Sequence, residues 1–219
     1  VQSATIPDLI AGRDVCGRAP TGSGKTIAFG LPLIARVERA KPRKPRALVL
    51  APTRELAAQI QRELAPLAEA RSKTVFTVYG GVGYEPQRRA LKRGVDVLVA
   101  CPGRLEDLID QRVVDLRDVD IVVIDEADRM ADMGFLPAVR RILNATAPNR
   151  QTMLFSATLD GDVAVITREY QRDAIRHEVE GTDADALDAE HRFETVESDQ
   201  RLGRAAELIG AEGSTIVFC

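Results

Sequence analysis

The chain has 219 residues, 45% of them hydrophobic and 29% charged, with a formal net charge of −3 at pH 7. This length and apolar content are enough for one large α/β domain, and without a long apolar run or a signal-peptide pattern we expect a soluble, cytoplasmic protein with no membrane contact. The negative charge excludes a chain that is basic overall, so any nucleic-acid contact must be local, and the 3 cysteines fit neither a disulfide framework nor a zinc site.

Strand-like and helix-like segments alternate along the sequence. Strands are expected near 14–18, 47–51, 74–79, 95–101, 120–124 and 152–156, with a last one at 175–180. Helices are expected near 25–40, 54–70, 84–93, 104–111, 134–144 and 160–171. This alternation is typical of an α/β fold in which helices cover both faces of a parallel sheet.

An acidic segment at 181–190 interrupts this pattern. It is rich in small residues and poor in large apolar ones, as linkers are. We therefore predict a first domain at 1–180, a linker at 181–190 and the beginning of a second domain at 191–219. Within that last part, a helix is expected at 201–209 and a strand at 214–219.

A glycine loop, Ala-Pro-Thr-Gly-Ser-Gly-Lys-Thr at 19–26, directly follows the first expected strand. Gly22 and Gly24 would let backbone N–H groups turn inward onto an anion. The usual phosphate-binding loop has glycine where this chain has Ala19, so an ordinary strand-to-helix turn is the alternative.

Two side chains at the end of this loop have the chemistry that nucleotide binding needs. Lys25 begins the next expected helix, whose N-terminal dipole favours phosphate, and its ammonium group would reach the β and γ phosphates. The Thr26 hydroxyl would ligate magnesium. The predicted ligands are therefore a nucleotide and Mg²⁺.

An acidic motif, Val-Ile-Asp-Glu-Ala-Asp at 123–128, follows about a hundred residues later. The apolar run at 121–124 is typical of a strand that is buried on both faces, and ligands bind at the carboxyl ends of such strands. Asp125 is placed there to hold magnesium, and Glu126 to polarise the attacking water. The alternative is that these acids only stabilise the start of a helix at 127–132.

Taken together, the motifs resemble those of the DEAD-box ATP-dependent RNA helicases, over nearly the whole chain. In chain order the further matching motifs are Pro52-Thr53-Arg54-Glu55-Leu56-Ala57, Gly80-Gly81, Pro102-Gly103-Arg104, Asp125-Glu126-Ala127-Asp128 and Ser156-Ala157-Thr158. Ala19 is what this family usually carries at the head of its phosphate loop. The resemblance implies a RecA-like P-loop NTPase domain that couples ATP binding and hydrolysis to RNA binding and local duplex unwinding.

For the ATP site, the resemblance implies a set of nucleotide-binding residues: Gln2, Ala19, Thr21, Gly22, Ser23, Gly24, Lys25 and Thr26. Gln2 resembles the glutamine that reads adenine, but the aromatic residue that the family places upstream of it is absent from this sequence, so weaker adenine discrimination is expected. Catalytic roles are implied for Lys25, Asp125, Glu126, Ser156 and Thr158, and metal ligation for Thr26 and Asp125. Asp128, Ser156 and Thr158 would couple hydrolysis to strand separation. The alternative for this segment is the N-cap of the helix near 160, a role that Ser156, Thr158 and Asp160 could all fill.

For RNA, the resemblance implies sequence-independent backbone contacts from Pro52, Thr53, Arg54, Gly80, Gly81, Pro102, Gly103 and Arg104. Arginines at helix N-termini suit phosphate, and surface charge alone is the alternative for Arg54 and Arg104. Cys101 stands where the family usually has threonine, so a hydroxyl contact is expected to be lost. The basic segment at 39–46 is interpreted as a solvated loop, with an auxiliary RNA contact as the alternative.

The resemblance also implies a second RecA-like domain in cis, which supplies arginines to the ATP site and half of the RNA groove. No residues of this sequence match those motifs, and such an arginine is worth about 10³ to 10⁵ in rate. We therefore expect this chain to bind nucleotide and to hydrolyse it very poorly. The rival functions are an ATP-gated RNA clamp without turnover, against which Glu126 argues, a small-molecule P-loop kinase and a DNA-directed relative.

Overall fold

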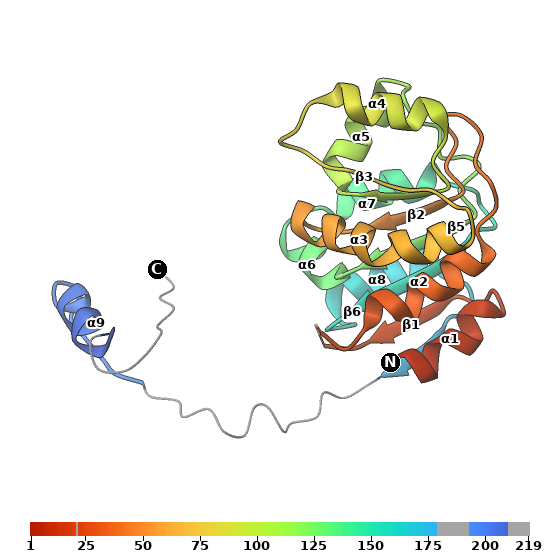
Figure 1. Cartoon of the computed structure of the whole chain (residues 1–219). Coiled ribbons are helices and arrows are strands. Elements are labelled where there is room, and N and C mark those ends of the chain that lie inside the picture. The colour runs from red at the N-terminus through yellow and green to blue at the C-terminus, as the bar shows by residue number, and fades with distance from the viewer. Residues whose placement is uncertain (21, 179–192, 210–219) are drawn as a thin grey trace. The chain divides into compact units, whose positions relative to one another are not determined.

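The computed structural model describes residues 1–20, 22–178 and 193–209. The chain divides into two compact units, Val1–Gly181 and Thr182–Cys219. The first unit is a sheet flanked by helices (Figure 1). In the second unit the structure describes the helix α9 (Arg201–Ile209), while the segment 181–190 and the strand expected at 214–219 lie outside the described residues. The predicted domain limits stay predictions.

The sheet of the first unit has seven strands, in the order β3-β4-β2-β5-β6-β1-β7, and every neighbouring pair is parallel. In chain order they are β1 (Val15–Arg18), β2 (Ala47–Leu50), β3 (Val75–Val78), β4 (Val97–Ala100), β5 (Ile121–Asp125), β6 (Gln151–Ser156) and β7 (Ile175–Glu178). The seven strands predicted for the first domain are all present. The predicted parallel α/β fold is therefore confirmed.

Helices cover both faces of this sheet (Figure 1). They are α1 (Gln2–Ile10), α2 (Lys25–Arg36), α3 (Arg54–Ala70), α4 (Tyr84–Arg93), α5 (Pro102–Asp110), α6 (Ala127–Asp132), α7 (Leu136–Asn144) and α8 (Gly161–Tyr170). Side chains of α1, α2 and α3 pack with alternate strand residues such as Val49 into one core. The intervening strand residues, such as Leu48, form the other core with α4 to α8. This alternation explains why the central strands are apolar throughout.

Two helices differ from the sequence expectation. The helix α1 was not among the predicted helices, and it contains Pro7. The helix α2 ends at Arg36, four residues before the expected end at 40, because Val37 is extended (φ −60°, ψ 133°) and 4% exposed, so that burying its side chain ends the helix. The basic segment that follows is a loop with a turn closed by Lys44 N–H donating to the Lys41 carbonyl at 3.0 Å.

Candidate active site at the carboxyl ends of the strands

The topology brings the glycine loop and the acidic motif to the same edge of the sheet. Strands β5, β6 and β1 are neighbours, so the segments that follow them converge at their carboxyl ends. Ala19 N–H donates to the carbonyl oxygen of Ser156 at 3.1 Å, which ties the start of the glycine loop to the end of β6. Motifs about 100 to 140 residues apart in the sequence thus form one site.

The glycine loop has the backbone conformation that its sequence predicts. Gly22 and Gly24 have φ values of 81° and 83°, which residues with side chains rarely adopt. A Cβ atom on Gly24 would also lie 2.5 Å from Nε2 of Gln2, whose side chain amide donates to the Gly24 carbonyl at 3.4 Å. Gln2 therefore packs against the loop, although a contact with adenine stays a prediction. Thr21 lies outside the described residues.

Lys25 and Thr26 begin α2 and are both largely buried. Lys25 is 7% exposed, and its Nζ donates to the Ala19 carbonyl at 3.1 Å across the glycine loop. Ser23 Oγ donates to the Pro20 carbonyl at 2.8 Å, which closes the loop on itself. The Lys25 ammonium group thus lies against a loop whose turns at Gly22 and Gly24 can present backbone N–H groups to an anion.

Asp125 ends β5 as a buried carboxylate that is 2% exposed. Burial raises its pKa to about 6, the positive charge of Lys25 counteracts this in part, and the neighbouring Glu126 raises the pKa further. Its Oδ1 accepts the Glu126 backbone N–H at 3.0 Å. A buried carboxylate next to one lysine is a favourable place for a further cation.

Glu126 adopts the left-handed conformation, with φ 52° and ψ 53°, directly after the strand. Such a conformation is costly for a residue with a side chain and is found most often at functional sites. The carboxylate is 14% exposed and forms an ion pair with Arg129 at 3.4 Å. The strained turn therefore separates Glu126 from Asp125, so that the two carboxylates can have different roles.

The last aspartate of the acidic motif joins β5 to β6. Asp128 N–H donates to Ser156 Oγ at 3.1 Å, and Asp128 Oδ2 accepts the N–H groups of Ala157 at 3.1 Å and Thr158 at 3.3 Å. Asp160 occupies the N-cap position of α8, so Ser156 and Thr158 do not have the N-cap role considered as the alternative. Their part in coupling stays a prediction.

A cavity of about 770 Å³ adjoins these groups and includes residues that the sequence analysis did not single out. Its lining joins Gly22, Gly24, Lys25, Thr26, Thr53, Asp125 and Glu126 to Glu55, Leu56, Gln59, Arg62, Glu63 and Arg129. Most of the unpredicted residues lie on α3 at three- and four-residue spacing. That spacing marks one face of a helix, but only the tertiary fold shows that this face borders the cavity.

The predicted RNA-binding motifs lie at the same edge, after the neighbouring strands β2, β3 and β4. Thr53 caps α3, since its Oγ1 accepts the Leu56 N–H at 3.2 Å, and Arg54 follows it with a side chain that is 65% exposed. Gly81 has φ 80°, and a Cβ atom there would lie 3.6 Å from the Arg54 guanidinium. Pro102 and Gly103 begin α5. The predicted motifs are thus neighbours.

Arg104 differs from this exposed pattern. Its side chain is 7% exposed, and both Nη atoms donate to the Val82 carbonyl at 3.1 Å. Its guanidinium also lies 4.0 Å from the centre of the Tyr84 ring. In this structure Arg104 supports the loop after Gly81, and a phosphate contact of its side chain stays a prediction.

Residues 1–166 match the family model described as DEAD/DEAH box helicase. The chain belongs to this family. Among relatives of the DEAD-box domain, "Probable ATP-dependent RNA helicase DDX46" of Danio rerio is 39% identical over all of this chain and 22% of its own length. "Pre-mRNA-processing ATP-dependent RNA helicase prp-5" of Neurospora crassa is 41% identical over 96% of this chain and 18% of its own length. The DEAD-box domain thus spans about a fifth of these relatives.

Solved structures agree with the family. A hypothetical ATP-dependent RNA helicase from Sulfolobus tokodaii is 38% identical, with a TM-score of 0.75 over 81% of this chain and 51% of that one. A DEAD box protein from Methanococcus jannaschii is 30% identical, with a TM-score of 0.77 over 94% of this chain and 55% of that one. The predicted RecA-like fold is confirmed.

The described residues of this DEAD-box domain contain neither a cluster of metal-ligating side chains nor a membrane-spanning helix. Among them, no group of three or more His, Cys, Asp or Glu side chains could hold a metal ion. No described helix is long and apolar enough to cross a lipid bilayer.

Proposed function

We propose that this chain is the ATP-binding domain of an ATP-dependent RNA helicase, which hydrolyses ATP and uses the binding energy to hold and locally open RNA. The convergence of Lys25, Asp125 and Glu126 on one cavity, next to the Asp128 to Ser156 contact, carries the proposal. Because the chain spans 22% and 18% of its first two relatives, the activity of any whole protein containing it is part of the proposal.

ATP and Mg²⁺ fit the residues that are present. The glycine loop and Lys25 would bind the phosphates, and the Thr26 hydroxyl and Asp125 carboxylate would hold Mg²⁺, which prefers oxygen ligands and usually takes others from phosphate and water. The buried carboxylate of Asp125 is the observation that supports a cation here. Bound Mg²⁺ would neutralise charge on the phosphates during transfer.

Glu126 is the residue proposed to activate water. Its carboxylate lines the cavity beyond Asp125, and its ion pair with Arg129 fixes the side chain at one end of the motif. From there it would accept a proton from the water that attacks the γ-phosphate. Phosphoryl transfer depends mostly on position and electrostatics, so this placement matters more than the intrinsic basicity of a carboxylate.

RNA would bind at the adjoining edge, where Arg54, Gly81 and Gly103 are exposed. Backbone N–H groups and an arginine favour phosphates over bases, which predicts sequence-independent binding. Asp128 belongs to the acidic motif and accepts N–H groups from the segment after β6, so a shift of either segment changes the other. This contact is the proposed link between hydrolysis and RNA.

Full activity is proposed to need a second RecA-like domain in cis, which would close on ATP and RNA and supply arginines to the site. The cytoplasmic location stays a prediction. The Neurospora relative is named as a pre-mRNA-processing helicase, and on that basis we include a role in RNA processing in this proposal.

Nucleotide binding by the 219-residue chain tests the first step directly. Titration with a fluorescent ATP analogue, in Mg²⁺ and then in excess chelator, should show binding that weakens without the metal. ATP should displace the analogue better than GTP if Gln2 reads adenine. Absence of nucleotide binding in Mg²⁺ would contradict the proposal.

A further inference from the structure

A second charged groove lies along α4, from Glu85 to Lys92, and shares no lining residue with the cavity of the proposed ATP site. It has a volume of about 420 Å³ and is lined by Arg43, Glu85, Arg88, Arg89, Lys92, Gln111, Arg112 and Val113. These residues come from the basic loop before β2, from α4 and from the segment after α5. Five lining residues are basic and one is acidic, although the chain as a whole has a net charge of −3. Positive charge is therefore concentrated in this groove.

The positive charge of the groove is not neutralised by the protein itself. Within residues 1–20, 22–178 and 193–209, the side chains of Arg43, Arg89, Lys92 and Arg112 form no ion pair or hydrogen bond, and all of them are exposed. Arg88 donates only to the neutral amide of Gln111. Several cations held together without counter-charges repel one another, so an anionic ligand would relieve an electrostatic cost.

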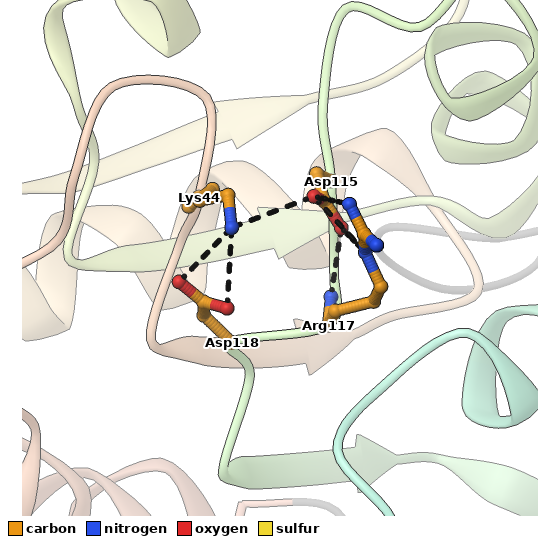
Figure 2. A network of polar contacts seen from close by, with 4 residues as sticks. All are labelled: Lys44, Asp115, Arg117 and Asp118. Carbon is orange, nitrogen blue, oxygen red and sulfur yellow. Dashed lines mark hydrogen bonds and ion pairs between the residues drawn. The ribbon is translucent and has the colours of Figure 1, made fainter.

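The neighbouring cavity shows the contrasting case. It shares Arg43 and Arg112 with the groove, but its other cations are paired. Figure 2 shows Lys44 between Asp115 and Asp118, at 3.7 Å and 3.4 Å, and Arg117 on Asp115 at 2.7 Å. The pair with Arg117 lowers the pKa of Asp115 to about 2, so this carboxylate keeps its charge. Among the described residues of the two cavities, the basic side chains without an ion pair therefore line the groove along α4.

Backbone hydrogen bonds fix the position of the loop that carries Arg43. Its N–H donates to the Leu91 carbonyl at the end of α4 at 2.8 Å, and its own carbonyl accepts the Asp115 N–H at 2.9 Å. Arg43 and Arg112 both adopt positive φ values, 64° and 55°. Both arginines thus occupy unusual backbone positions at the border of one groove, and the loop is held in place rather than free.

Phosphate is the anion that this lining suits best. Arginine presents a planar fork of donors that matches phosphate oxygens, and the groove has three exposed arginines beside Arg43. Val113 is the only apolar residue among its described lining, so a protein partner would find no hydrophobic anchor of the kind that dominates protein interfaces. A phosphodiester backbone needs none.

The helix α4 connects this groove to the proposed RNA edge. It begins at Tyr84, whose ring contacts Arg104 at 4.0 Å and Arg88 at 5.6 Å, and it ends at Arg93 beside the groove. Ten helical residues span about 15 Å. A stacked RNA strand rises about 3.4 Å per nucleotide, so about four nucleotides would follow the groove along the length of α4.

We propose that this groove binds the phosphate backbone of RNA that extends beyond the edge formed by residues 52–54, 80–81 and 102–104. The inference rests on the proposed function, since it assigns the groove to the same RNA. The groove would be a second contact region for RNA molecules that are too long to be held by this edge alone.

The test compares single-stranded RNAs of about six and about twenty nucleotides in fluorescence anisotropy, with the full 219-residue chain. A triple variant, Arg89→Gln, Lys92→Gln and Arg112→Gln, removes groove charge. A matched triple variant, Arg71→Gln, Lys73→Gln and Arg168→Gln, removes equal charge outside it. Removing basic residues near the C-terminus of α4 could also lower the stability of the fold, because positive charge is favourable there. Thermal unfolding of all three proteins therefore shows whether weaker RNA binding comes from a less stable protein.

The groove variant should bind the long RNA about tenfold more weakly, with a salt dependence reduced by about two phosphate contacts, and should bind the short RNA as before. The matched variant should bind both RNAs as the unchanged protein does. Equal affinity of the groove variant for the long RNA would overturn the inference and leave the proposed function intact. Absence of RNA binding by the unchanged protein would overturn both.

A polyglutamate peptide of similar length serves as the competitor from another class of polyanion. Weak binding of the peptide by the unchanged protein would support a phosphate-specific groove. Tight peptide binding that the groove variant loses, together with unchanged RNA binding, would show a protein-binding surface and overturn the RNA assignment.

Discussion

The backbone N–H of Asp128 donates to Ser156 Oγ at 3.1 Å, which joins the helix after β5 to the end of β6. Ser156 is fully buried, and the Asp128 carboxylate binds the backbone just beyond it. Asp128 of the acidic motif is thus hydrogen-bonded to the end of β6, which also contacts the start of the glycine loop.

Ser156→Ala removes the acceptor and leaves the Asp128 N–H without its partner. Such a loss should lower the free energy of unfolding by about 1–3 kcal/mol, measured by urea unfolding. ATP affinity should change less than RNA-stimulated turnover, because the nucleotide ligands are untouched. Ser198→Ala, which removes an exposed hydroxyl outside the first unit, is the control. RNA-stimulated turnover that Ser156→Ala leaves at the level of this control would contradict a coupling role for Ser156.

Lys25→Ala should weaken ATP binding by about tenfold or more, because it removes a charge-assisted contact to phosphate worth about 1.5–3 kcal/mol. A direct titration with a fluorescent nucleotide measures this. Lys73→Ala, which changes the same charge outside the site, should bind ATP normally. Unchanged ATP affinity of the Lys25 variant would show that the glycine loop does not bind phosphate in the proposed way.

Asp125 gives the site a pH dependence whose sign follows from burial. Its pKa rises from 3.8 to about 6 in the folded chain, so protonation favours the folded state below pH 4 and this contribution is lost as the pH rises through 6. Without nucleotide, Asp125→Asn should therefore be more stable than the unchanged chain at pH 7, by about 2–3 kcal/mol at most. The difference should vanish near pH 4 in urea unfolding measured across the pH range.

The same carboxylate should have the opposite effect on metal binding. Mg²⁺ needs the ionised form, so the Mg²⁺-dependent part of ATP affinity should fall as the pH drops through 6. In Asp125→Asn this dependence should be absent. A metal-dependent affinity that is equal at pH 5 and pH 8 would contradict the role of Asp125 as a ligand.

Much of the fold followed from the sequence because its central strands are apolar on both faces. Leu48 and Val49 belong to different cores, yet both are fully buried, so the run 47–50 could only be an interior strand. The helix α1 was not among the predicted helices. Pro7 argues locally against it, whereas packing of Leu9 in the core favours it. Tertiary contacts overrode local preference there.

The sequence predicted the site residues that belong to contiguous motifs. It missed the residues that only the tertiary fold brings to the site. Lys25 and Asp125 could be singled out from their own neighbours in the sequence. The burial of Arg104 under Val82 and the presence of Arg62 and Arg129 around the cavity depend on contacts between distant segments. The basic loop likewise gained meaning only when the structure placed Arg43 beside Arg112 in one groove.

Steady-state ATP hydrolysis tests the central claim most directly. The protein should be this chain joined to a second RecA-like domain, measured without nucleic acid, with single-stranded RNA and with single-stranded DNA, beside its Glu126→Gln variant and the 219-residue chain alone. We predict turnover that RNA stimulates more than DNA, a loss of about 10²–10⁴ in the variant and almost no turnover by the chain alone. Turnover that ignores RNA, or that survives Glu126→Gln at the unchanged rate, would contradict the account.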